Sequence, residues 1–441
     1  MVPSCHCQRS GNLASNRFPL LLLGSSLILG CGSNTSTQPL QGHQRALRHH
    51  IKHVVIIFQE NRSFDNLFSG FPGADAASSG ISNGQAIPLQ PVPFEQPGDL
   101  DHTHPGWWAD WDGGKNDGFA HVGNFPIPNM PYAYVPRNET KQYWDLASQY
   151  VLADRMFQSN TGPSFVAHQY LIAGQSEDAD EVPSNAGSAW GCDSPPDATV
   201  AVVGPNGTDL PGPFPCFDYQ TIGDLLDAAH VSWKYYAPSA TGGDIGYIWS
   251  AYDAVRHIRF GPDWAGDVIS PETQVLSDIE NGKVAQVSWV IPSWANSDHA
   301  GNLSTTGPDW VASIVNAIGT SQYWDDTAVF IAWDDWGGWY DHVPPPQLDE
   351  MGLGFRVPLI VVSPYARHGY ISHRQHEFAS ILHFTEDAFG LPSLGTRDAI
   401  SDDLLDCFDF SQPAQPYTQM QTNLSPEYFK HQISTGPPDT D

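Results

Sequence analysis

Basic residues are scarce in this sequence of 441 residues, which has 19 Lys and Arg against 49 Asp and Glu. The formal net charge is therefore −30, and a chain of this charge repels other polyanions, so the composition argues against nucleic-acid binding. Charged residues make up only 15% of the chain and hydrophobic residues 40%, which excludes wholesale disorder. The 40 glycines and 37 prolines argue against an all-helical bundle and indicate long ordered loops around a compact sheet.

Long hydrophobic runs are also missing, apart from the segment Phe18–Gly30 near the N-terminus. This run of 13 residues is too short to cross a bilayer core of about 30 Å. Arg9 and Arg17 precede it, and no acidic residue occurs before Glu60. The pattern is typical of a secretory signal peptide over residues 1–30, so we expect an exported protein that is secreted, periplasmic or attached to the cell envelope.

Few cysteines remain once such a signal is removed. Cys31 directly follows the hydrophobic run in a segment that resembles a bacterial lipobox. Either a lipid anchor at this residue or ordinary cleavage nearby would follow. Cys192 and Cys216 lie in one loop region rich in Pro and Gly, so they are the favoured disulfide pair, which leaves Cys407 as a buried thiol. The spacing of Cys and His does not match a structural zinc site.

Short β-branched runs that end abruptly in polar residues predict buried strands. Five segments have this form: 53–58, 232–237, 286–291, 327–333 and 357–362. Between them, Gly307–Gly319 places Trp310, Ile314, Val315 and Ile318 on one helical face, and Thr221–His230 begins with a Thr that can cap a helix. Strands that alternate with amphipathic helices indicate an α/β fold around a largely parallel sheet.

The rest of the chain divides by composition. Residues 31–50 are polar and predict a flexible leader, and residues 51–415 hold the strands and helices of one catalytic domain. Two long irregular regions within it, 71–135 and 177–217, are rich in Gly, Pro, Asp and aromatic residues, and loops of this length are usually functional. The polar segment 416–441 predicts a loosely ordered C-terminal tail.

Acidic and amide side chains follow several predicted strands in the chain. They are Glu60, Asn61, Asp298, Asp334 and Asp335, with His299 beside Asp298. Ligands of open α/β sheets bind at the carboxyl ends of the strands, so these side chains are expected to meet at one rim. So many like charges require protonation, cationic partners or a metal ion, and basic residues are few, so a divalent cation is the simplest answer. Residue types alone leave Ca, Mg, Mn and Zn open, and each acid taken singly would equally well cap a helix or turn.

Several segments resemble, in order, the bacterial phosphoesterase family that includes nonspecific phospholipases C and acid phosphatases. The most specific is the ENRSFD core of Val54–Gly73, and the others are Asp101–Phe119, Tyr143–Gly174, Trp333–Pro346 and Gly354–His373. The colinear likeness covers roughly residues 51–410. It implies an alkaline-phosphatase-like α/β sandwich in which a metal ion assists a nucleophile.

The resemblance also assigns site residues. Those that match the family's metal site are Glu60, Asn61, Asp334 and Asp335. Ser164 stands where the family has a Ser or Thr nucleophile, within a Gly-Pro-Ser turn, and the neighbouring Thr161 is its competitor. The pKa of a free serine hydroxyl is too high for the group to ionise unaided, and a coordinated cation would lower it.

Histidines would bind phosphate oxygens or protonate the leaving alcohol. By the resemblance these are His102, His299 and His342, with His104 as an alternative to His102. For each of them a hydrogen-bonded structural role is the competing interpretation. The segment after Ser164 departs from the family, because it lacks the usual Pro-Asn, so the side of this turn that faces the substrate is expected to differ.

The expected activity is hydrolysis of phosphate esters through a serine phosphoenzyme, with phospholipids as the first substrate class. An acid phosphatase acting on small phosphomonoesters is the alternative, since the longer phospholipases carry further domains. Tryptophans flank the same segments and would either bind a choline-like cation or simply pack together: Trp107, Trp108, Trp111, Trp336 and Trp339. A noncatalytic envelope protein that binds glycans through its tryptophans and acidic loops is the remaining alternative of another class.

Overall fold

The computed structural model describes residues 42–121, 127–184, 190–205, 207–238 and 248–432. All of them belong to the compact unit Leu40–Asp441. The expected signal peptide over residues 1–30, Cys31 and most of the expected leader lie outside the described residues. None of the described helices is long and apolar enough to cross a membrane.

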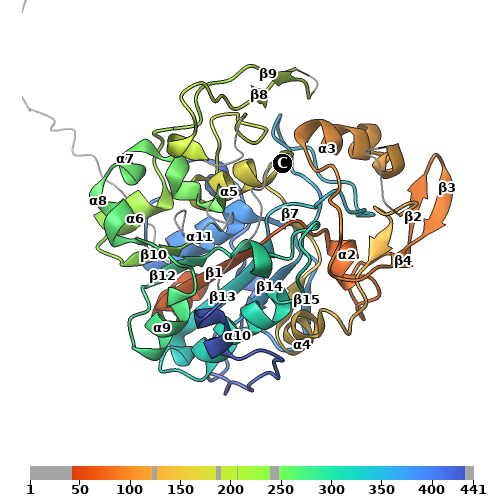
Figure 1. Cartoon of the computed structure of the whole chain (residues 1–441). Coiled ribbons are helices and arrows are strands. Elements are labelled where there is room, and N and C mark those ends of the chain that lie inside the picture. Colours follow the sequence, from red (N-terminus) through yellow and green to blue (C-terminus); the bar gives the residue numbers. More distant parts are fainter. Residues whose placement is uncertain (1–41, 122–126, 185–189, 206, 239–247, 433–441) are drawn as a thin grey trace, which may run out of the picture. The chain divides into compact units, whose positions relative to one another are not determined.

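Within the described residues, eight strands form one sheet in the order β11-β10-β12-β1-β13-β14-β6-β15 (Figure 1). Their bounds are β1 His53–Gln59, β6 Val151–Ala153, β10 Trp233–Tyr236, β11 Val268–Ile269, β12 Val287–Val290, β13 Thr327–Trp333, β14 Leu359–Val362 and β15 Tyr370–Ser372. Only β14 runs antiparallel to its two neighbours in this sheet. The expected α/β fold with a largely parallel sheet is confirmed, and each of the five predicted strands is present.

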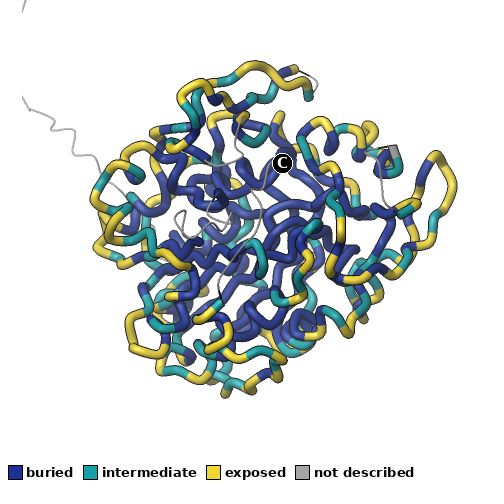
Figure 2. The backbone as a smooth tube through the Cα atoms, in the orientation of Figure 1, coloured by how far each residue is buried: buried dark blue, intermediate teal, exposed yellow. Residues whose placement is uncertain are grey.

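The central strands are buried because helices cover both faces of the sheet. The helices are α1 Gly42–His50, α2 Phe64–Phe68, α3 His104–Trp111, α4 Lys141–Gln149, α5 Ser164–Ala173, α6 Ile222–Ala228, α7 Arg256–Arg259, α8 Pro262–Gly266, α9 Gln274–Glu280, α10 Gly307–Gly319, α11 Phe378–Phe389 and α12 Pro426–Lys430. Helix α11 contacts α1 and α5, and α10 contacts α4, α9 and α12; Figure 1 shows these two groups on opposite sides of the sheet. The strands between them form the dark interior of Figure 2.

Local sequence explains the two helices that were predicted. In α10 the apolar residues Trp310, Ile314, Val315 and Ile318 are all buried, which is the face that their spacing predicted. Helix α6 begins after Thr221, whose hydroxyl accepts a hydrogen bond from the Asp224 backbone while the Asp224 carboxylate bonds back to the Thr221 backbone.

Both polar ends of the domain are more ordered than their composition predicted. Residues 42–50 form α1, in which Leu47 is buried and Arg48 Nε donates to the Asp387 carbonyl at 2.8 Å, so the flexible leader expected up to residue 50 is wrong for these residues. Residues 416–432 are likewise ordered, because Phe429 of α12 is buried against Trp310 at a ring distance of 5.3 Å. Residues 433–441 lie outside the described part of the chain.

The two long irregular regions contain short elements. The first holds β2 Ser79–Ser82, β3 Gln85–Pro88, β4 Gln90–Pro91, β5 Ala133–Tyr134 and α3, and the second holds β8 Val202–Val203 and β9 Asp209–Leu210. Two further short strands, β7 Met156–Phe157 and β16 His376–Glu377, pair beside the main sheet. The second region contains the predicted disulfide between Cys192 and Cys216, and Cys407 is a buried free thiol, as expected.

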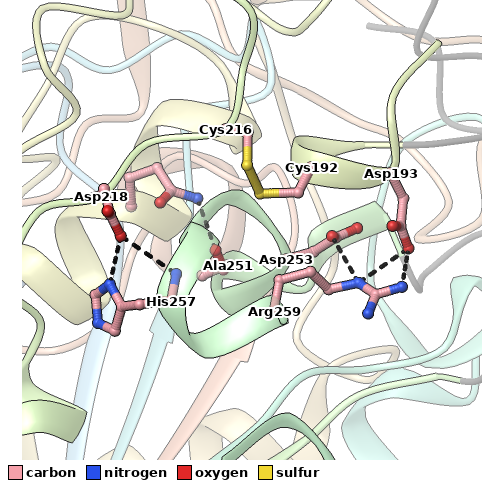
Figure 3. The surroundings of a disulfide bond; sticks show 9 residues. Cys192, Asp193, Cys216, Asp218, Ala251, Asp253, His257 and Arg259 are labelled. Atoms are coloured by element: carbon pink, nitrogen blue, oxygen red, sulfur yellow. Dashed lines mark hydrogen bonds and ion pairs between the residues drawn. A yellow bond between two sulfur atoms is a disulfide. The ribbon is translucent and has the colours of Figure 1, made fainter. Parts of the chain in front are cut away.

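The disulfide lies beside three ion pairs (Figure 3). Arg259 pairs with Asp253 and with Asp193, which directly follows Cys192, while Asp218, two residues after Cys216, pairs with His257 at 2.7 Å. These contacts fix the loop to the segment around residues 251–259.

Candidate active site

The candidate site begins where β1 and β13 end. The two strands pair in parallel as far as Gln59 and Trp333, so the residues that follow them leave the sheet side by side. The Asn61 backbone donates to Asp334 Oδ1 at 2.7 Å, and Asn61 Nδ2 donates to both oxygens of Asp335, at 3.0 and 3.1 Å. The structure thus brings together the acids and the amide that the sequence placed at this rim.

Close contact between the backbones of Asn61 and Gly337 stabilises this arrangement. Asn61 has a φ of +56° and Gly337 a φ of +62°. A Cβ atom on Gly337 would lie 2.2 Å from the Asn61 carbonyl, so only glycine fits there. The Gly337 amide donates to Asp335 Oδ1 at 2.7 Å, which fixes the orientation of this carboxylate.

Ser164 opens helix α5 and contacts the same carboxylate. Its Oγ donates to Asp335 Oδ2 at 3.3 Å. The preceding turn is close-packed, because a Cβ on Gly162 would lie 2.3 Å from the Asp180 carbonyl. Thr161, the competing nucleophile, is also buried, and its hydroxyl hydrogen-bonds to none of the described residues. The geometry therefore favours Ser164 as the hydroxyl of this site.

His168 was missed by the sequence reasoning. It lies one helical turn after Ser164, and its Nε2 is 3.0 Å from Glu60 Oε1. Ligand atoms of Glu60, His168 and Asp334 all lie within 4.8 Å of one another. The signal that could have found it is the spacing of four residues, which places both side chains on one face of a helix. Burial lowers the pKa of His168 to about 4, despite the opposing charge of Asp334.

The residues at this rim fit a divalent cation. Asp334 Oδ2 and Asn61 Oδ1 are buried and accept no hydrogen bond from any described residue. Burial, and then the neighbouring charge of Asp334, raise the pKa of Asp335 well above its usual range. Buried oxygens of this kind, with repelling charges, are the ligands that hard divalent cations take. Oxygen ligands with one nearby imidazole leave the identity of the metal open.

Two of the predicted histidines lie close to this rim. The rings of His102 and His299 are 5.6 Å apart, and both are near enough to Asp335 for their charges to lower its pKa. His102 Nδ1 lies 2.8 Å from the Leu100 carbonyl, and His299 Nδ1 contacts the Ala300 carbonyl. A carbonyl only accepts, so Nδ1 carries the proton in each neutral ring. Asp99 joins these two histidines in a second group of close ligand atoms.

His342 lies in a different cluster. Its Nδ1 is 2.7 Å from Asp65 Oδ2 and its Nε2 is 3.1 Å from Asp75 Oδ1. Burial opposes a charge on this ring, but the hydrogen bond and the charge of Asp65 raise its pKa to about 9. Arg356, paired with Asp341 at 2.8 Å, completes the cluster. Both ring nitrogens are thus engaged in ion pairs, so a catalytic role of His342 stays a prediction that this geometry does not favour.

His104, the alternative to His102, also has its own partners. Its Nδ1 lies 2.9 Å from Asp209 and 3.2 Å from Asp180, and Trp108 Nε1 donates to its Nε2 at 2.9 Å. Since both nitrogens of His104 are used in this way, the geometry favours His102.

Asp298 comes after β12 in the chain, as expected, and its hydrogen bonds stabilise the loop that carries His299. Its Oδ2 accepts hydrogen bonds from Tyr143 at 2.7 Å and from Trp333 at 3.0 Å. Burial raises its pKa to about 7, although these hydrogen bonds and Arg62 oppose the rise.

The tryptophans near the site serve largely as packing. Trp107, Trp336 and Trp339 are fully buried in two hydrophobic clusters, so they present no open cage to a cation from solvent. Trp339 lies instead under the Arg62 guanidinium, 5.2 Å from the ring centroid. Trp108 and Trp111 are half-buried.

The chain is similar in sequence to known proteins. A model of the phosphoesterase family matches residues 51–392. Phospholipase C B of Mycobacterium tuberculosis is 27% identical over 433 residues, which cover 83% of this chain and 79% of that protein. Hemolytic phospholipase C of Pseudomonas aeruginosa is 25% identical, over 82% of this chain and 56% of that protein, so this chain spans little more than half of the longer relative.

Among solved structures, a protein of the alkaline phosphatase superfamily from Vibrio parahaemolyticus matches 80% of this chain and 70% of its own, with 12% identity and a TM-score of 0.39. The fold class itself is established by the sheet topology described above.

The chain belongs to the phosphoesterase family. It is a hydrolase that acts on phosphoric ester bonds.

Proposed function

We propose that the protein is an exported, cation-dependent phosphoesterase of the phospholipase C type that works through a phosphorylated Ser164. The observation that carries the proposal is the contact between Ser164 Oγ and Asp335 Oδ2, at 3.3 Å, beside the acids that follow β1 and β13. A hydroxyl at a helix N-terminus and a buried group of oxygen ligands are the two parts that this reaction needs.

Ser164 would attack phosphorus in line with the leaving alcohol. The Oγ–P bond forms as the bond from phosphorus to the alcohol oxygen breaks. The N-terminal turn of α5, which begins at Ser164, would favour the negative charge of the phosphoryl oxygens, because the N-terminus of a helix carries a partial positive charge. In the second step water attacks phosphorus, releases the phosphorylated head group and regenerates the Ser164 hydroxyl.

His102 and His299 are the proposed proton carriers. Each holds its Nδ1 proton on a backbone carbonyl, so Nε2 is the nitrogen that exchanges a proton with the leaving alcohol or the attacking water. Asp298 would support this role through the loop that carries His299.

The bound divalent cation would supply positive charge that lowers the pKa of the attacking hydroxyl and offsets charge on the phosphoryl oxygens. Glu60, Asn61, Asp334 and Asp335 would hold it. Without the cation, the buried carboxylates would instead repel a phosphate.

Phospholipids are the proposed substrates because the named relatives are phospholipases C. The disulfide Cys192–Cys216 supports export, since such bonds persist in oxidising compartments. A lipid anchor at Cys31 would keep the enzyme at the cell envelope, where phospholipid is at hand.

The test is hydrolysis by the purified protein of phosphatidylcholine vesicles and, separately, of an aryl phosphate. We expect diacylglycerol and phosphocholine from the vesicles. Ser164→Ala should lower kcat/KM by at least about 10³-fold, because it removes the nucleophile. Thr161→Val, in the same turn, is the matched control and should stay within about tenfold of the wild-type enzyme.

Three results would contradict the proposal. Free phosphate from the aryl ester, with intact vesicles, would assign the chain to the acid phosphatases. Full activity of Ser164→Ala would exclude a mechanism through a phosphorylated Ser164. Glycan binding without any hydrolysis would support the alternative of a noncatalytic envelope protein.

A further inference from the structure

His168 has no assigned role, although it lies inside the candidate site. Its side chain is fully buried, and its Nε2 faces Glu60 Oε1 at 3.0 Å. The same helix carries Ser164 one turn earlier, so α5 brings two polar groups to the two acidic strand ends. The question is whether the imidazole binds the cation itself or holds Glu60 in place.

The surroundings of the second ring nitrogen, Nδ1, distinguish between these two roles. His168 Nδ1 is buried and has no hydrogen-bond partner among the described residues. On one side the ring packs edge-on against Phe58, with a centroid distance of 5.0 Å. An imidazole that binds a metal through Nε2 carries its proton on Nδ1, and such a proton is almost always donated to a carboxylate, a carbonyl or water.

In the first role, therefore, Nδ1 would be a buried N–H donor with no acceptor among the described residues. In the second role, Nε2 carries the proton and donates it to Glu60, and Nδ1 keeps only a lone pair. A buried donor without an acceptor is the more costly arrangement, because carbonyls and acceptors tolerate a missing partner better than N–H groups do. The distance of 3.0 Å is that of an ordinary N–H···O bond.

We infer that His168 is a positioning residue of the cation site: it donates Nε2–H to Glu60 Oε1 and so fixes the orientation in which the other carboxylate oxygen binds the cation. The inference rests on the proposed function, because it takes the strand-end acids to be a cation site. His168 lies in the segment after Ser164, where this chain departs from the pattern of the family.

The experiment compares Mn²⁺ binding by the wild-type protein, His168→Gln and His168→Leu. Glutamine places an N–H donor near the position of Nε2, whereas leucine has a similar volume and no donor. We expect His168→Leu to weaken Mn²⁺ binding by about 10- to 100-fold and His168→Gln to stay within about threefold of wild type. His376→Leu removes another buried histidine, in a separate cluster with Asp402, and should leave the affinity unchanged.

A spectroscopic measurement decides between the two roles even where the leucine variant does not fold. Electron spin echo spectra of bound Mn²⁺ detect a directly coordinated imidazole nitrogen. We expect the same nitrogen signal in wild type and in His168→Gln. A signal that is present in wild type and lost in His168→Gln would make His168 a ligand and overturn the inference.

Failure of this inference differs from failure of the proposed function. Unchanged Mn²⁺ binding in a folded His168→Leu variant of an active enzyme overturns the positioning role alone. A wild-type protein that binds no Mn²⁺ and hydrolyses no phosphoester overturns both.

Discussion

Two buried acidic clusters lie close together in the sequence and differ in how their charge is balanced. The cluster of Asp65 and Asp341 contains its own cations, because Arg356 binds Asp341 through two nitrogens, at 2.8 and 3.0 Å, and His342 pairs with Asp65. At the strand ends, no Lys or Arg of the described residues forms an ion pair with Asp334 or Asp335. The first cluster is therefore complete as folded, whereas the second is built to receive a cation.

Among the substitutions that test this difference, Asp335→Asn should have the largest effect on activity. It should lower kcat/KM by about 10³-fold or more, because it removes a charge that Ser164 contacts and that would bind the proposed cation. In chelator, however, the variant should be at least as stable as wild type, because the pKa of Asp335 is already raised by burial and by Asp334. Urea unfolding with and without chelator, together with phosphoesterase kinetics, would measure both effects.

Asp341→Asn should behave in the opposite way. Removing one partner of a buried ion pair takes two short hydrogen bonds from Arg356 and leaves it with Asp65, at 3.5 Å, so we expect a loss of about 3 kcal/mol in the free energy of unfolding. Mn²⁺ affinity of the folded protein should stay near that of wild type. If Asp335→Asn in chelator destabilises the protein as much as Asp341→Asn does, the two clusters do not differ in the way described.

A smaller effect is expected from pH. Burial opposes the charge on His342, but Asp65 raises its pKa to about 9, above the ordinary value of 6.5. Its ion pairs with Asp65 and Asp75 therefore stabilise the fold fully below about pH 6.5, and this contribution is lost as the pH rises through 9. Arg356 keeps its charge throughout this range.

The measurement is thermal unfolding of wild type and His342→Gln from pH 6 to 10. The difference in Tm should be largest at the acidic end and should vanish above pH 9. A difference that stays constant over the whole range would show that His342 is neutral in the folded protein.

Much of the fold could be predicted because the strands are short, β-branched and buried on both faces. Such runs are distinct even in one sequence, and parallel topology then places their carboxyl ends at one rim. This rule alone predicts that Glu60 and Asp334 lie close together. The pairing of Cys192 with Cys216 could likewise be predicted, since both lie in one loop.

The rest depended on contacts between distant segments. Helix α1 has one buried apolar residue, Leu47, and is held by contacts with α11 that its own sequence does not reveal. His342 was assigned by resemblance, but its partner Asp65 lies 277 residues away in the sequence. His168 was overlooked because its one signal, the spacing of four residues from Ser164, lies in a helix that is buried along its whole length.

The pairing of β1 with β13 limits which insertions and deletions the two strands can tolerate. Gln59 and Trp333 are partners in the sheet, so the spacing between the two strand ends depends on the length of each strand. A single-codon insertion in either strand would turn alternate side chains to the other face and separate the acids that follow.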